Sequence, residues 1–150
     1  MTIQALPAGM TSDKSAVFGL IALMANANAY SQTLSTITTA GTNSTLTTAQ
    51  ALSGVVRFTS GASGGWTATL PTTKALIAAL GPTIPTDGTF AKRISFLNDN
   101  VGQTGTLTAG DASTTITGTA TFLTDTRRDY IMTVTSSSTI TFQNLGSAAI

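Results

Sequence analysis

Apolar and polar residues alternate along much of the chain after residue 51, and threonine is the usual polar partner. Threonine is β-branched, and alternation with a period of two is typical of strands that have one buried and one solvent-exposed face. The pattern therefore predicts a β-rich domain over residues 51–150. Its clearest examples are Thr115-Ile116-Thr117, Thr133-Val134-Thr135 and Thr139-Ile140-Thr141.

Turn-forming residues divide this domain into about seven strands, with a turn signal at roughly every 8–12 residues. Residues 128–135 and 139–143 predict a hairpin across Ser136–Ser138, and Ala91–Leu97 predicts the strongest single strand. The spacing favours an all-β fold, either an antiparallel β-sandwich or a jelly-roll-like barrel.

One short helix is expected inside the β domain, at about residues 73–80. A threonine, Thr72 or Thr73, can serve as its N-cap, and Gly81-Pro82 is a stop signal. The buried faces of the strands are predicted to carry Val56, Phe58, Leu70, Ile94, Phe96, Leu107, Ile116, Phe122, Ile131, Val134, Ile140 and Phe142.

Residues 1–50 differ from the rest and predict an N-terminal arm or anchoring segment. Residues 17–24 are apolar with partly helical spacing, so a short helix and an extended arm both fit. Residues 14–30 have the order of a signal peptide, but a single basic residue, Lys14, precedes the apolar run. The run is too short to span a bilayer, and no membrane partner is expected. The residues predicted to anchor the chain or to form an oligomer interface are Val17, Phe18, Leu20, Ile21, Leu23 and Met24.

Composition narrows the possible chemistry. The chain has 32 threonines and 14 serines among 150 residues, and it has no histidine, cysteine or glutamate. Zinc sites, thiol chemistry and histidine-based triads therefore lack the residues that form them. The aspartates lie mostly beside turn-forming residues. The sequence predicts no catalytic residue, no cofactor and no metal site, and hence a protein that is not an enzyme.

The low charge of the chain bears on its partners. Charged residues make up 9% of the sequence and the net charge is +1. The few basic residues do not form the stripe that nucleic-acid binding needs, so no nucleic-acid partner is expected. A neutral surface gives little repulsion between molecules, and it is easier to explain if neighbouring subunits cover much of it.

Two pairs of residues are candidates for contact with a partner. Arg127 and Arg128 lie beside aspartates, which fits either local ion pairs on a strand edge or a contact between subunits. Trp66 and Tyr130 could offer stacking faces to a sugar ring, although a tryptophan that begins a strand is more often a core or interface anchor.

Residues 54–146 resemble a module of tailed-bacteriophage virions. The segments that carry the resemblance are Thr69–Leu80, Phe96–Asp99, Thr106–Gly110, Ile116–Thr119, the strand that opens with Arg128-Asp129-Tyr130, and Thr139–Phe142. Similar modules occur in head decoration (cement) proteins and head fibres, usually as homotrimers. The N-terminal segment lies outside the resemblance.

The resemblance implies a virion structural protein and no catalytic residue. Such a protein would decorate and stabilise the outside of a capsid by binding at junctions between major capsid proteins, as a homotrimer on the capsid surface. The alternative is a receptor- or glycan-binding fibre or adhesin module, with Trp66 and Tyr130 as its contacts.

Overall fold

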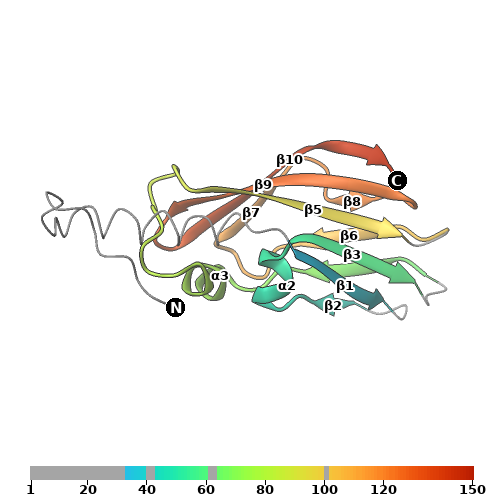
Figure 1. The fold of residues 1–150 in the computed structure, drawn as a ribbon, viewed down its shortest axis with the longest axis horizontal. Coiled ribbons are helices and arrows are strands. Elements are labelled where there is room, and N and C mark those ends of the chain that lie inside the picture. The colour runs from blue at the N-terminus through green and yellow to red at the C-terminus, as the bar shows by residue number, and fades with distance from the viewer. Residues whose placement is uncertain (1–32, 40–42, 61–63, 100–101) are drawn as a thin grey trace, which may run out of the picture. The chain divides into compact units, whose positions relative to one another are not determined.

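The computed structural model describes residues 33–39, 43–60, 64–99 and 102–150, which form a β-rich fold (Figure 1). Two short helices accompany the strands in this part of the chain. In chain order the elements are β1 (Thr33–Thr39), β2 (Ser44–Thr45), α2 (Thr48–Leu52), β3 (Gly54–Ser60), β4 (Trp66–Thr69), α3 (Thr73–Leu80), β5 (Ala91–Asp99), β6 (Gly105–Thr108), β7 (Thr114–Thr117), β8 (Thr121–Phe122), β9 (Thr126–Ser136) and β10 (Thr139–Ala149).

The strands form two sheets, and successive strands from β1 to β9 alternate between them (Figure 1). The six-stranded sheet has the order β1-β3-β5-β9-β10-β7, and the four-stranded sheet has the order β2-β4-β6-β8. Neighbours within a sheet are therefore often two strands apart in the chain. The pairs β1–β3, β3–β5, β2–β4 and β4–β6 are all parallel.

The sheets are mixed, which corrects the prediction of antiparallel sheets. From β1 to β6, a chain that crosses to the other sheet and back returns in its original direction, which makes these pairs parallel. The later pairs β6–β8 and β5–β9 are antiparallel. The hairpin predicted around Ser136–Ser138 is confirmed, since β9 and β10 pair antiparallel with Ile140 opposite Val134 and Phe142 opposite Met132. Alternation along the sequence predicts strands, but it does not distinguish a hairpin from a crossing between sheets.

The described residues between 33 and 50, which the sequence predicts as part of an N-terminal arm, include β1, β2 and the start of α2. Strand β1 pairs along its whole length with β3, from Thr33 opposite Gly54 onwards. Leu46 is buried, and Thr47 forms a capping box with Gln50 at the start of α2. The threonine-rich stretch forms an edge strand because its backbone can pair with β3 even though few of its side chains are apolar.

An aromatic cluster joins the two sheets. Phe58, Phe96 and Tyr130 come from the six-stranded sheet, while Trp66 and Phe122 come from the four-stranded sheet. The ring centroids of Phe58 and Trp66 are 4.3 Å apart, and Phe122 lies 5.8 Å from both Trp66 and Phe96. Each of the five side chains is at most 2% exposed. Rings of this size bury the largest apolar areas in the unit and dominate its stability.

The predicted helix is confirmed as α3, Thr73–Leu80. The side chain of Thr72 accepts from the backbone N–H of Ala75, so Thr72 is the N-cap. Asp111 accepts from both the N–H and the hydroxyl of Thr73, at 2.7 and 2.9 Å. A carboxylate at this position satisfies a free N–H at the helix start and is favoured by the helix dipole.

The predicted core is largely correct. All of its residues are buried except Ile116 and Ile131, which are partly exposed. Tyr130 and Met132 occupy the core in place of Ile131, because Ile94 of β5 lies opposite Tyr130 and sets which residues of β9 face inward.

Gly105 lies opposite Trp66 in the β4–β6 pair, and a Cβ there would lie 2.1 Å from the indole ring. We therefore expect Gly105→Ala to lower the free energy of unfolding by about 1–3 kcal/mol, the usual cost of overpacking a core. Gly64→Ala is the matched control, since nothing lies within 4 Å of its added Cβ. Urea unfolding followed by tryptophan fluorescence measures the stability of both variants. Equal unfolding midpoints for Gly105→Ala and Gly64→Ala would contradict this account of Gly105.

Candidate functional site

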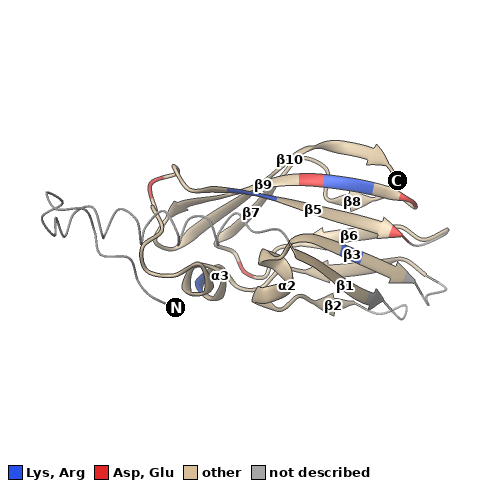
Figure 2. Ribbon diagram, in the orientation of Figure 1, with Lys and Arg blue, Asp and Glu red and all other residues tan. Residues whose placement is uncertain are grey.

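One face of the six-stranded sheet packs on the aromatic cluster, and we call the opposite face the outer face. Two rows of side chains cross it from β1 to β9, as the strand registers show: Leu34, Val55, Ser95 and Asp129 in the first, and Thr36, Arg57, Leu97 and Arg127 in the second. Figure 2 shows charged segments on β5 and β9 within a sheet that is otherwise mostly uncharged. By register, the outer face carries Arg57, Arg93, Arg127 and Asp129, whereas Lys92 and Arg128 on the same strands face the other way.

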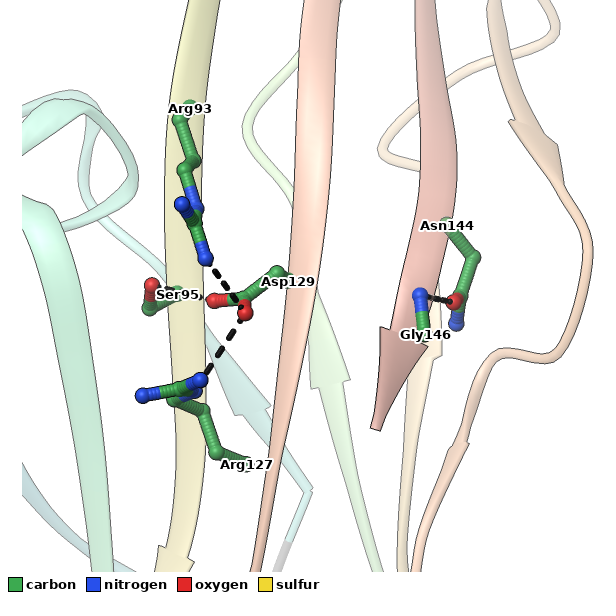
Figure 3. A network of polar contacts seen from close by, with 6 residues as sticks. All are labelled: Arg93, Ser95, Arg127, Asp129, Asn144 and Gly146. Carbon is green, nitrogen blue, oxygen red and sulfur yellow. Dashed lines mark hydrogen bonds and ion pairs between the residues drawn. The ribbon is translucent and has the colours of Figure 1, made fainter. Parts of the chain in front are cut away.

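Asp129 is the centre of a polar cluster on this face, drawn in Figure 3. Arg93 Nη2 donates to Asp129 Oδ2 at 2.7 Å, and Ser95 Oγ donates to Oδ1 at 2.5 Å. Arg127 Nε forms an ion pair with Oδ2 at 3.3 Å. The Asp129 cluster thus consists of Arg93 and Ser95 from β5 with Arg127 and Asp129 from β9.

The Asp129 carboxylate is well shielded, whereas its two cationic partners reach into solvent. Its side chain is 13% exposed, against 52% for Arg93 and 43% for Arg127. Burial alone would raise the pKa of Asp129. The hydrogen bonds from Ser95 and Arg93 and the charges of Arg127 and Arg93 outweigh it, so the pKa lies below its ordinary value. The carboxylate stays ionised, and the cluster carries a net charge of +1.

A second ion pair on the outer face is neutral. Arg57 Nη2 pairs with Asp99 Oδ2, one guanidinium to one carboxylate. The Asp129 cluster differs because two guanidinium groups share a single carboxylate.

The predicted pair Arg127 and Arg128 divides between two environments. Neighbouring residues of a strand face opposite sides, so Arg127 joins the outer face while Arg128 Nε donates to the backbone carbonyl of Thr121. The predicted ion pairing is confirmed for Arg127 with Asp129. However, β9 lies between β5 and β10, so the pair is not on a strand edge.

Trp66 and Tyr130 are core residues, which corrects their prediction as glycan contacts. Their side chains are 2% and 0% exposed, because both rings lie in the aromatic cluster between the sheets. The Tyr130 hydroxyl donates to the carbonyl of Thr119 at 2.8 Å, and burial raises the pKa of this phenol. Neither ring offers a free face for stacking.

The predicted anchoring residues lie outside the described part of the chain. They are Val17, Phe18, Leu20, Ile21, Leu23 and Met24, and their role stays a prediction. Arg93 and Ser95 were not predicted as site residues. Their alternation on one strand indicates a shared face, but only the β5–β9 register brings them to Asp129.

The edge of β10 carries a β-bulge between Asn144 and Gly146. Asn144 Oδ1 accepts from the backbone N–H of Gly146 at 2.6 Å, as Figure 3 shows. Strand β7 pairs with β10 only as far as Gln143, so the bulge begins just beyond that pairing.

Comparisons of the chain with protein-family models, with curated proteins and with solved structures find no match. No helix in the described residues has the length and hydropathy needed to cross a bilayer.

We expect Asp129→Asn to lower the free energy of unfolding at pH 7 by about 1.5–3 kcal/mol, the range for hydrogen bonds to a charged group. Because folding lowers the pKa of Asp129, the ionised group stabilises the fold above its ordinary pKa of 3.8. That contribution is lost as the pH falls through the lower, folded-state pKa. The difference between wild type and Asp129→Asn is therefore expected to shrink below pH 3.8.

Urea unfolding at pH 7 and at acid pH measures this difference. Asp125→Asn is the control, since Asp125 is exposed with φ 50°, a conformation that asparagine adopts readily. We expect it to change stability by less than about 0.5 kcal/mol. A difference for Asp129→Asn that is constant with pH would contradict the electrostatic account.

Proposed function

We propose that the chain is a virion structural protein of a tailed bacteriophage, located on the capsid surface. It decorates and stabilises the outside of the capsid by binding at junctions between major capsid proteins, and it acts as a homotrimer. The resemblance of residues 54–146 to head decoration and head-fibre modules supports this proposal. Among the two architectures expected from the sequence, we favour the sandwich, since rings from both sheets meet in one cluster.

The observation that carries the proposal is the open edge of β1. Within the described residues β1 pairs only with β3, so its other side is unpaired. Its sequence, TLSTITT, has no charged residue and no proline, and Leu34 is 62% exposed. Soluble proteins usually protect such an edge with charge, proline or a bulge, and an unprotected edge is suited to pairing with another chain.

Decoration suits a protein of this kind because many weak contacts act together. Each subunit of a trimer engages the shell through a small area, and linking three such areas raises the overall affinity far above that of one. Binding only to the assembled shell then stabilises that shell by mass action. The glycan-binding alternative depends on contacts from Trp66 and Tyr130, and both side chains are buried in the core.

Heads assembled without the protein provide the test of β1. We expect the full-length chain added back to decorate them, and Leu34→Lys to need roughly 10-fold more protein for half occupancy because it charges the pairing edge. Leu123→Lys, at a side chain 55% exposed outside β1, is the control and should bind as wild type. Electron microscopy of the heads counts the occupied positions. Heads that stay undecorated by the wild-type chain would reject the capsid role.

The predicted anchor is tested on the same heads. If residues 17–24 anchor the chain, Leu20→Asp with Ile21→Asp should greatly reduce decoration, since burying two carboxylates in an apolar contact is costly. The urea midpoint of the β unit should not change. Full decoration by this variant would remove the anchoring role while leaving the role of β1 intact.

A further inference from the structure

The two guanidinium groups of the Asp129 cluster have unused hydrogen-bond donors. A guanidinium carries five N–H donors, and the Asp129 carboxylate engages one nitrogen of Arg93 and one of Arg127. One of the two carboxylate oxygens also accepts from Ser95. The Nε atom of Arg127 is buried, and its described contact is the 3.3 Å ion pair with Asp129. The side chains of Arg93 and Arg127 are 52% and 43% exposed, so a ligand can reach the guanidinium groups of a cluster whose net charge is +1.

The cluster borders a hollow that is partly apolar. Val55 and Leu97 line it together with Arg93, Ser95 and Arg127. Val55 lies beside Ser95, and Leu97 lies beside Arg127, in the two cross-strand rows of the outer face. A ligand in this hollow would contact the guanidinium groups of Arg93 and Arg127 and the aliphatic side chains of Val55 and Leu97.

We propose that Arg93 and Arg127 together bind a carboxylate group that is attached to an apolar body. An arginine fork matches the two oxygens of a carboxylate, and charge-assisted pairs of this kind are the strongest hydrogen bonds at protein surfaces. The apolar body packs against the side chains of Val55 and Leu97. Such a group is found on an acidic side chain within an apolar segment of a partner protein and on a small organic acid.

The charge balance selects a single negative charge. A carboxylate neutralises the excess of +1, whereas a phosphate dianion would place a second negative charge close to Asp129. Asp129 itself acts as a positioning residue, since its ionised carboxylate holds both guanidinium groups at the border of the hollow. This inference does not depend on the capsid role, because it follows from the outer face alone.

Titration of the isotope-labelled full-length chain with benzoate tests the site by nuclear magnetic resonance. We expect benzoate to shift the guanidinium Nη–H signals of Arg93 and Arg127 and the amide signal of Leu97, with saturation in the millimolar range. Benzamide has the same shape without the charge and should shift none of them. Inorganic phosphate should bind more weakly than benzoate.

Substitutions assign the binding to the two arginines. Arg93→Gln should weaken benzoate binding about 10-fold, which corresponds to the loss of roughly one charge-assisted hydrogen bond. Arg93→Lys keeps the charge but loses the fork, and it should weaken binding as well. Arg57→Gln is the matched control on the same face and should leave binding within about 2-fold, since Arg57 is paired one to one with Asp99.

A glutamate-containing apolar peptide and its glutamine counterpart distinguish the two sources of the carboxylate. Tighter binding of the glutamate peptide than of benzoate assigns the site to a protein partner, and the reverse assigns it to a small acid. Equal shifts with benzoate and benzamide, phosphate binding as tight as benzoate, or unchanged binding in Arg93→Gln would each overturn the proposal. These outcomes are independent of head decoration, which the full-length chain reports separately.

Discussion

The packing of aromatic rings between two sheets is the interaction on which the rest of this fold depends. Single strands of threonine, serine and alanine bury little apolar area, and the four-stranded sheet includes two strands of only two residues. Trp66 and Phe122 fix that sheet against Phe58 and Phe96 of the other. The chain crosses between the sheets after almost every strand, so the strands that carry these rings are joined by connections from one sheet to the other. A loss of packing here would loosen both sheets at once.

The same cluster determines what the outer face can present. Once Phe96 and Tyr130 point inward, Ser95, Leu97 and Asp129 must point outward, since side chains alternate along a strand. The polar cluster on the outside is therefore a consequence of the aromatic packing inside. A shift of one residue in the β5–β9 register would place Asp129 in the core and would separate it from its cationic partners.

Local features of the sequence predict the strands, helix α3 and most of the core, because alternation and capping depend on neighbouring residues. The pairing of strands is not local. Val55 lies opposite Ser95, and Arg93 contacts Asp129, although many residues separate the partners in the chain. The length of the intervening chain does not predict which sheet each strand joins. Ile131 shows the limit within a strand, since Tyr130, Ile131 and Met132 are all apolar and alternation cannot choose among them. The sequence of residues 33–39 predicts an arm and not a strand, because an exposed edge strand such as β1 needs few apolar side chains.

The bulge at Asn144 and Gly146 distinguishes the part of β10 that extends beyond β7 from the regular edge strand β1. The side-chain Oδ1 of Asn144 accepts from the N–H of Gly146, and a bulge bends the strand, so β10 is an irregular edge for pairing beyond the end of β7. Strand β1 offers a regular one. A chain that adds to the six-stranded sheet along a full strand is therefore expected at β1 and not along the bulged part of β10.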